Sequence, residues 1–594
     1  MEDFIHQEFH WIDWLVIAGY LALTTFVGHM MRGKQGTIRD FFLGGKSLPW
    51  QAVSGSMIAT EISGVTFIGV AGTLFALHGN FTYLLWGIGS IMGRVIVAKW
   101  FVPKFYEDEI YSPYDYMGRR LGKSVKKLAT ILFTIGSILA QSVRVFVAAI
   151  PLKLVTGLPI EACIIIIGVF AIAWTLMGGM RTVIWTDVMQ FGLFTLGGLL
   201  TLFWIIGSLN GGWAEYWETA SLFTRTDAWD SRFGFGAELE FTIWVAIIAV
   251  PFQNMTAFGV DQLNAQRMFC CKDAKSASKA LVWSSVGQLM TLMMLLVGSA
   301  LVVHYNKNPF TPREGIVVMD IKDKDFASAS KKAEVALANA QRLESTEATA
   351  ARKEYIKSNP DDIGAKNFTH EGVSNVVVAS KRDNIFPMWI VTQLPIGLSG
   401  LILAGVFAAA ISSLDSILAA LSQTTLSLMY HPETKTDEEL EKLDLVSKSR
   451  KLVIGWGIIL TLFTLLLMKA NEGVNVLSLA FGMTAYTMGP MLGLFLASMI
   501  GKASVRGLVI GVVSSLILVL FIRTDIWNLI ATNNQGLAEF LGDLPTLDMT
   551  EVTTDETTTY KFKSVFYFGW AWPITTILTL ACGLLIPSKN KDAS

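Results

Sequence analysis

The sequence predicts an all-α polytopic membrane protein with about thirteen transmembrane helices. Of its 594 residues, 52% are hydrophobic and 16% are charged, whereas a soluble domain carries roughly 25% charged residues. Apolar runs of about 20 residues, long enough to cross a bilayer, recur along the whole chain. Lys and Arg collect in alternate loops between these runs. This pattern excludes a cytosolic enzyme, a disordered scaffold and a nucleic-acid binder, and it makes the lipid bilayer the expected solvent.

The apolar runs give the predicted spans in chain order. They cover residues 11–30, 49–77, 80–103, 127–155, 159–178, 184–208, 241–266, 280–304, 387–428, 452–469, 474–499, 506–522 and 565–587. The run 387–428 is longer than one crossing needs, and Pro395 and Gly397 interrupt it. Because neither residue favours a helix interior, we expect a short approach helix before the crossing that ends near Met429.

Basic residues orient the spans, since loops rich in Lys and Arg stay in the cytoplasm. The loops predicted to be cytoplasmic contain Arg32, Lys34, Arg39, Lys46, Lys104, Arg119, Arg120, Lys123, Lys126, Arg181, Arg267, Lys272, Lys275, Lys279, Lys435, Lys442, Lys448, Arg450, Lys451, Lys502 and Arg506. The N-terminus has no Lys or Arg before Met30 and is predicted to lie outside. The C-terminus is then predicted to be cytoplasmic, in a plasma or inner membrane.

The sequence contains no complete phosphate-loop or zinc-binding motif of the kind found in soluble enzymes. Residues 44–47 (GGKS) resemble the end of a phosphate-binding loop, but Asp40 takes the place of its first glycine. The seven His form no zinc-spaced pair. The cysteines lie inside or at the edges of apolar runs and indicate no disulfide framework; they are Cys163, Cys270, Cys271 and Cys582. The chain is therefore predicted not to be an enzyme, and any transport would draw on an ion gradient.

The second span carries polar and small residues at its middle, within 59–69. Thr60, Glu61, Ser63 and Thr66 are costly in a membrane unless they have a function. Gly64 can break the helix, and an unwound turn exposes carbonyl oxygens of the kind that an alkali cation accepts. A helix crossing built on small residues is the alternative.

The seventh span is also interrupted, by Pro251 and Gly259, and it contains Gln253, Asn254 and Asp261. It lies five spans after the second. Two broken segments at the first positions of two five-span halves indicate an inverted repeat with its binding site at mid-membrane.

Three further spans carry polar residues at depth. In the ninth span, Ser412, Ser413 and Ser416 follow helical spacing beside Asp415. In the sixth span, Asp187 lies one turn from the cytoplasmic end, where it either adds negative charge to these hydroxyls or pairs with a basic loop residue. In the fourth span, Arg144 lies too deep to reach the surface and needs an anion. The anion is either Glu61 or a substrate, whereas Arg94 and Lys99 are interpreted as structural.

Several stretches resemble the sodium/solute symporter family, which includes sodium-coupled sugar, proline, iodide, monocarboxylate and sialic acid transporters. They are SLPWQAVSGSMIATEISGVTFIG, GGMRTVIWTDVMQ, DQLNAQRMFCCKDAKSASKA, GLILAGVFAAAISSLDSIL and AYTMGPMLGLFLA, in family order from about residue 10 to residue 522. The resemblance implies a LeuT-type core of five plus five inverted helices after one extra helix.

With the resemblance, the chain divides into a membrane core and two long outer stretches. The composition of 305–386, rich in Ala, Lys and Glu, predicts a helical insertion. The predicted divisions are 1–48 (extracellular N-terminus, extra helix and cytoplasmic loop), 49–304 (first repeat, spans 2–6, and the start of the second, spans 7–8), 305–386 (extracellular helical insertion), 387–522 (the rest of the second repeat and the following helix), 523–564 (extracellular loop) and 565–594 (last helix and cytoplasmic C-terminus).

The resemblance also implies where sodium binds. The backbone ligands would be Ala59, Ile62 and Ala409, and the hydroxyl ligands Ser412 and Ser413. Some members hold a second sodium with an Asp and further serines. The matching residues here are Asp187, Ser412, Asp415 and Ser416, where Asp415 takes the place of a serine. Sodium is the expected coupling ion, and no other metal is expected.

The substrate pattern departs from the sugar-transporting branch of the family. At the positions of that branch's sugar contacts, this chain has Thr66, Gly87, Ala257, Asn254 and Gln288, so only the Asn is retained. The sialic-acid-type pattern matches better, with Arg144 opposite a substrate carboxylate. The predicted substrate-binding residues are Ser63, Thr66, Trp86, Arg144, Asn254 and Phe481.

Together these features predict a sodium-coupled secondary active symporter that imports a small carboxylate-bearing anion, sialic-acid-like or a monocarboxylate, by alternating access. A symporter for a neutral solute such as a sugar, a polyol or proline is the alternative. A membrane sensor and an ion channel are two further alternatives, against which the short C-terminus and the paired broken helices argue. The expected partners are the solute, sodium and the lipid bilayer, with no nucleic acid and a monomeric functional unit.

Overall fold

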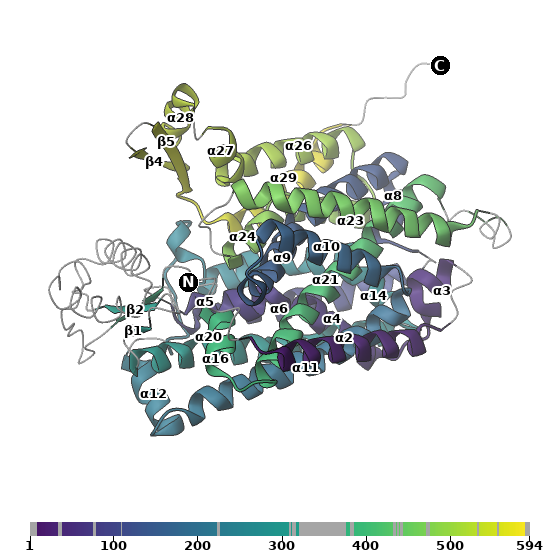
Figure 1. Ribbon diagram of the computed structural model, residues 1–594. Helices are drawn as coiled ribbons and strands as arrows, with labels where there is room; N and C mark the ends of the chain where they lie inside the picture. Colours follow the sequence, from purple (N-terminus) through teal and green to yellow (C-terminus); the bar gives the residue numbers. More distant parts are fainter. Residues whose placement is uncertain are drawn as a thin grey trace, which may run out of the picture.

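The computed structural model describes residues 9–33, 38–74, 79–107, 110–222, 226–307, 310–311, 316–319, 376–379, 385–431, 435, 439, 443–470, 476–531, 534–554 and 557–587. These residues form a bundle of long helices that run roughly side by side (Figure 1). The long and core helices are α2 (Trp11–Met31), α4 (Trp50–Glu61), α6 (Leu85–Ile96), α9 (Lys123–Thr156), α10 (Ile160–Thr175), α11 (Met180–Gly207), α13 (Val250–Met255), α14 (Gln262–Met268), α15 (Ala274–Trp283), α16 (Gln288–Lys307), α20 (Ile385–Gln393), α21 (Leu398–Tyr430), α23 (Leu445–Ala470), α24 (Val476–Thr484), α25 (Met488–Ile500), α26 (Val505–Ile522) and α29 (Ala571–Leu585).

The helices coincide with the predicted spans. Among the described residues, 10 helices are long and apolar enough to cross a membrane, and a bent pair, Trp50–Glu61 with Val65–Thr73, brings the number to 11. Two shorter apolar helices, Ile160–Thr175 and Val245–Val260, lie where the fifth and seventh spans were expected. Helix therefore occupies every predicted run, and the multi-pass membrane architecture is confirmed.

Both expected breaks are present. After α4 the chain turns by 55° before the π-helical segment Val65–Val70, and Ile62 is extended with ψ 95°. In the seventh span the chain leaves the helix at Asp261, which has ψ 126°, and α14 begins at the next residue. Pro251 lies in the first turn of α13 and does not end the helix, so the break falls two residues after Gly259 and not at the proline.

The expected approach helix is α20, which precedes the long helix α21. Gly397 adopts a left-handed φ of 87° between them, a conformation that strains residues with a side chain. The Oδ1 atom of Asp13, on α2, accepts hydrogen bonds from the backbone N–H groups of Gly397 (2.7 Å) and Gly400 (2.8 Å). A buried carboxylate on the extra first helix therefore caps the beginning of α21.

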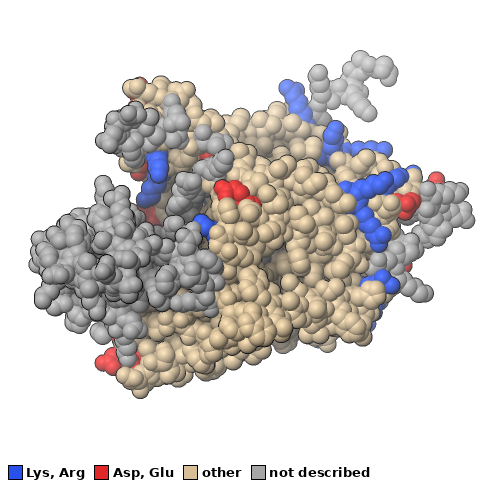
Figure 2. Space-filling view, in the orientation of Figure 1, with Lys and Arg blue, Asp and Glu red and all other residues tan. Residues whose placement is uncertain are grey.

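Short elements lie at the two ends of the bundle. They are α3 (Ile38–Leu43), α5 (Ala71–Thr73), α7 (Val102–Phe105), α8 (Pro113–Leu121), α12 (Gly212–Leu222), α27 (Asp525–Ile530), α28 (Gln535–Gly542), β1 (Phe310–Thr311), β2 (Ile316–Met319), β3 (Val376–Ala379), β4 (Leu547–Thr554) and β5 (Thr557–Ser564). The loops predicted to be cytoplasmic lie at the α3 and α8 end, and α12 and the strands lie at the opposite end (Figure 1). Lys and Arg gather at the α3 and α8 end (Figure 2). This agrees with the prediction that the basic loops all lie on the same side of the membrane.

The two outer stretches differ from expectation where they are described. The flanks of 305–386 form an antiparallel sheet in the order β1-β2-β3, and the helical prediction for its middle, 320–375, lies outside the described residues. The stretch 523–564, predicted as an extracellular loop, contains regular elements. It holds α27, α28 and the β4-β5 hairpin, which share a small core of their own that includes Leu541, Leu547 and Tyr560.

The cap on α21 predicts the effect of Asp13→Ala. The substitution leaves two backbone N–H groups at the start of a buried helix without an acceptor, which costs about 1.5–3 kcal/mol for bonds to a charged group. We expect a lower midpoint of thermal unfolding in detergent. Asp13→Asn keeps the Oδ1 acceptor, so its midpoint of thermal unfolding should fall clearly less. Equal losses in the two variants would contradict the capping role.

Candidate functional site

A cavity of about 170 Å³ lies beside both helix breaks. Its wall is formed by residues of α4, α6, α9, α13, α14 and α24, and by the breaks themselves. All the predicted substrate-binding residues line it: Ser63, Thr66, Trp86, Arg144, Asn254 and Phe481. The structure therefore brings together side chains that are up to several hundred positions apart in the sequence, while their role in binding stays a prediction.

One side of the cavity is aromatic. The rings of Trp86 and Phe481 meet edge to face with centroids 4.3 Å apart, and Tyr83 lies 5.6 Å from Trp86. The Trp86 indole N–H donates to the backbone oxygen of Glu240 (3.4 Å). This arrangement holds the ring in place and presents an apolar face to the cavity.

Asn254 reaches the cavity because α6 and α13 approach closely. A Cβ added at Gly93 would lie 2.6 Å from the Cβ of Asn254, so only glycine permits this contact. The Oδ1 of Asn254 accepts a hydrogen bond from Ser90 (2.8 Å), and its amide donates to Gln253 (2.8 Å). The amide is therefore held in one orientation at the cavity wall.

Glu61 is paired with Arg94 and not with Arg144. The two side chains form an ion pair in which Arg94 is fully buried. Gln288 also donates to Glu61 (3.1 Å), and Phe258 lies 4.2 Å from the guanidinium carbon of Arg94. Of the two anions considered for Arg144, the protein carboxylate is therefore already engaged.

Arg144 lines the cavity from the middle of α9. Its Nη1 donates to the backbone oxygen of Thr60 at the end of α4 (3.0 Å). Within the described part of the chain, no carboxylate lies in ion-pair distance of it. The guanidinium keeps further N–H donors in a planar fork, which is the geometry that binds a carboxylate with two hydrogen bonds.

The predicted sodium ligands meet where α4 ends against the middle of α21. The break leaves carbonyls of the last turn without helical partners, and α21 supplies donors to them. Ser412 donates to the oxygen of Ala59 (3.3 Å), and Ser413 to that of Thr60 (3.4 Å). Ile62 is buried at the break, and Ala409 lies one turn before Ser413 on α21. Carbonyl and hydroxyl oxygens are ligands that a sodium ion accepts, so the residues present fit the ion.

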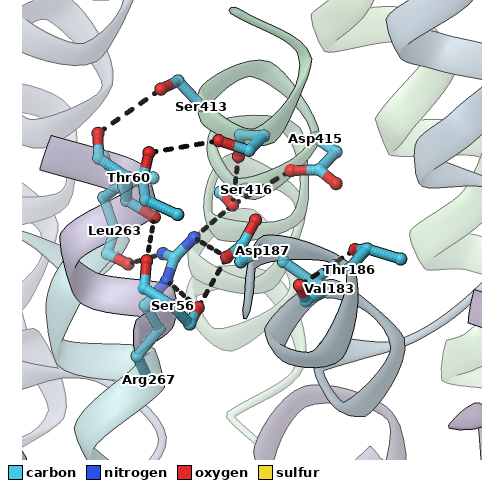
Figure 3. A network of polar contacts seen from close by, with 12 residues as sticks. Ser56, Thr60, Val183, Thr186, Asp187, Leu263, Arg267, Ser413, Asp415 and Ser416 are labelled. Carbon is cyan, nitrogen blue, oxygen red and sulfur yellow. Dashed lines mark hydrogen bonds and ion pairs between the residues drawn. The ribbon is translucent and has the colours of Figure 1, made fainter. Parts of the chain in front are cut away.

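The residues of the possible second sodium site also come together, with a guanidinium among them (Figure 3). Arg267 pairs with Asp187 (3.0 Å), donates to Ser56 (2.9 Å) and contacts Ser416. Ser416 in turn donates to the oxygen of Ser412 (2.6 Å) and lies 3.0 Å from Oδ1 of Asp415. Two buried carboxylates thus face one arginine.

The position of Arg267 corrects the sequence interpretation. We counted it among the cytoplasmic loop cations, but it lies on α14 and is fully buried. Its long side chain turns back into the bundle because Asp187 is buried there and a buried carboxylate needs a counter-charge. The ion pair with a basic residue, one of the two alternatives for Asp187, is therefore present. One oxygen of each carboxylate, Oδ1 of Asp187 and Oδ2 of Asp415, has no partner in the described residues, so the second sodium stays a prediction.

Sequence reasoning assigned no binding role to several polar residues of the cavity wall, among them Gln141, Asp261 and Asn264. Asp261 was noticed in the broken seventh span but given no role. Gln141 lies three positions before Arg144 on α9, which places both on one helical face. Asn264 lies in the first turn of α14, three positions after the N-cap Asp261. That spacing is the signal that would have found them.

A family model described as the sodium:solute symporter family matches residues 41–327. The sodium/sialic acid symporter SiaT of Proteus mirabilis is 26% identical over 522 residues, which make up 87% of this chain and 90% of that protein. The chain is thus similar to members of the sodium:solute symporter family along most of its length. The sodium/glucose cotransporter of Vibrio parahaemolyticus is also 26% identical to this chain, over 87% of the chain and 86% of the cotransporter.

Among solved structures, that of a substrate-bound, outward-open Na⁺-coupled sialic acid symporter matches with a TM-score of 0.68. The two chains are 23% identical, and the match covers 97% of each. The expected fold, an all-α LeuT-type inverted repeat, is thereby confirmed. The symporter is a sodium-coupled transporter of a small solute and not an enzyme, and sodium is its coupling ion.

The Arg267 network predicts a large loss of stability on Arg267→Ala. Removing one partner of a buried ion pair costs about 3–5 kcal/mol because it leaves an uncompensated charge, and here two carboxylates remain. We expect the variant to unfold at a clearly lower temperature. Adding Asp187→Asn removes one of the charges and should restore part of the loss. A double variant as unstable as the single one would contradict the pairing.

Proposed function

We propose that this symporter imports a small carboxylate-bearing solute together with sodium, and that Arg144 binds the carboxylate. The observation that carries the proposal is the position of Arg144: it faces the cavity, donates to a backbone oxygen, and pairs with no carboxylate of the described residues. A guanidinium in a low-dielectric cavity strongly favours an anionic ligand. The relatives whose names mention sialic acid, a carboxylate-bearing sugar, support the same class.

Sodium would couple to the solute through the break in α4. An ion bound by Ala59, Ile62, Ala409, Ser412 and Ser413 would tie the end of α4 to α21. The same turn of α4 supplies the Thr60 oxygen that positions Arg144. Sodium binding would therefore fix the cavity wall and raise the affinity for the solute. By linkage, the solute would raise the affinity for sodium by the same factor.

The remaining parts of the proposal concern placement in the cell. The basic end of the bundle would face the cytoplasm, which puts the N-terminus outside and the C-terminus inside a plasma or inner membrane. Alternating access would carry the solute inward, driven by sodium ions that move down their own gradient. A single chain contains both repeats and the whole cavity, so the functional unit would be a monomer.

The sodium site is tested by Ser412→Ala combined with Ser413→Ala. Loss of both hydroxyl ligands should raise the sodium concentration needed for half-maximal uptake by about tenfold or more, measured in proteoliposomes. Ser422→Ala is the matched control, because this buried hydroxyl of α21 donates only to its own helix, at Leu418 (2.7 Å). Uptake with unchanged sodium dependence in the double variant would refute the assignment.

The substrate class is tested by Arg144→Ala in sodium-driven uptake of carboxylates. Loss of a charge-assisted, two-point contact of about 3 kcal/mol corresponds to at least a hundredfold drop in uptake efficiency. Arg144→Lys retains the charge but lacks the planar fork. Its uptake efficiency should therefore lie between those of the native chain and of Arg144→Ala. If Arg144→Ala still transports carboxylates as well as the native chain, or if sodium drives only neutral sugars or polyols, the carboxylate proposal fails.

A further inference from the structure

The charges on the cavity wall are unevenly compensated. Of the described lining residues, Glu61, Arg144 and Asp261 are charged. Glu61 is neutralised by Arg94. Arg144 and Asp261 line the same cavity without forming an ion pair with each other. The cavity thus presents one positive and one negative group that a ligand lying between them could contact.

Asp261 sits at the second helix break, where its extended backbone places it as the N-cap of α14. Its Oδ1 accepts the backbone N–H of Leu263 (2.8 Å). No hydrogen bond or ion pair of the other oxygen is present in the described part of the chain. Ala257, four positions before Asp261, also lines the cavity and contributes only a methyl group. Nothing bulky at that position separates Asp261 from the cavity.

Two amide oxygens of residues that line the same cavity are buried. Within the described part of the chain, the Oε1 of Gln141 and the Oδ1 of Asn264 have no hydrogen-bond partner, and their residues are 5% and 8% exposed. The amide of Asn264 donates to the backbone oxygen of Ala257 (2.8 Å), which directs its oxygen elsewhere. A buried acceptor without a donor costs about 1–3 kcal/mol. The wall therefore offers acceptors for which the described residues provide no donor.

We propose that the solute is a dipolar ion, with an ammonium group bound by Asp261, Asn264 and Gln141 and its carboxylate bound by Arg144. An ammonium carries N–H donors but no acceptor, which suits a carboxylate beside two amide oxygens. The proposal rests on the carboxylate role of Arg144. It narrows the substrate class to amino acids and related small zwitterions.

Matched pairs of ligands test this on the full-length protein. Alanine and lactate, and proline and tetrahydrofuran-2-carboxylate, differ chiefly by ammonium against a neutral oxygen. Thermal stabilisation in sodium, titrated to an apparent Kd, should favour the amino member of at least one pair by about tenfold or more, since hydrogen bonds to charged groups are worth about 1.5–3 kcal/mol. N-acetylneuraminic acid serves as a further test ligand, because it has a carboxylate and no ammonium group.

Asp261→Asn removes the charge and keeps the cap, because Asn and Asp are equally good N-caps. The Kd ratio within the responding pair should fall from about tenfold or more to near one. Asp543→Asn, an exposed change outside the cavity, should leave the ratio as in the native chain. A ratio that stays the same in Asp261→Asn overturns the assignment of this residue.

The two proposals fail in different ways. Equal affinity for both members of every pair, or stabilisation by N-acetylneuraminic acid and by no amino acid, overturns the dipolar substrate while the carboxylate role of Arg144 stands. If no carboxylate of either kind stabilises the protein in sodium, the proposed function itself is wrong, and this inference falls with it.

Discussion

Hydrocarbon offers no hydrogen bonds, so every backbone group exposed by a broken helix must find a partner inside the protein. This constraint governs the centre of the molecule. Where α4 ends, its carbonyls accept the hydroxyls of Ser412 and Ser413 and the guanidinium of Arg144. Where the seventh span breaks, Asp261 caps the new helix. The groups that satisfy the breaks are thus the polar groups of the cavity and of the sodium site.

Buried charges follow the same logic of compensation. Arg94 neutralises Glu61, and Arg267 neutralises Asp187. Lys126 does so for Asp115 near the α8 end of the bundle (2.9 Å). The first two pairs join helices that do not follow each other in the chain, and the third joins the consecutive helices α8 and α9, so the pairs fix the packing as well as the charge. Arg144 and Asp261 stand apart, because they line the cavity without such a partner.

Periodicity and composition predicted the spans, both breaks and the polar residues at membrane depth, because a membrane makes such residues rare and therefore informative. The aromatic cavity residues Trp86 and Phe481 followed only with the family resemblance. The pairing of charges could not be predicted. Glu61 had two arginines within reach along the sequence, and only packing decides between Arg94 and Arg144. Arg267 was misplaced for a related reason, since a long side chain at a helix end can point to water or back into the bundle. The short strands flanking 320–375 gave too weak a pattern against a helix-forming composition.

Arg267 has a mechanical consequence. One guanidinium on α14 contacts Ser56 on α4, Asp187 on α11 and Ser416 on α21 (Figure 3). One side chain thereby connects helices of both inverted repeats at a single point. Relative motion at that point would have to separate opposite charges in a dry interior. The helices are interrupted at the extended residues Ile62 and Asp261, so we expect bending to occur at these two breaks and not at the Arg267 network.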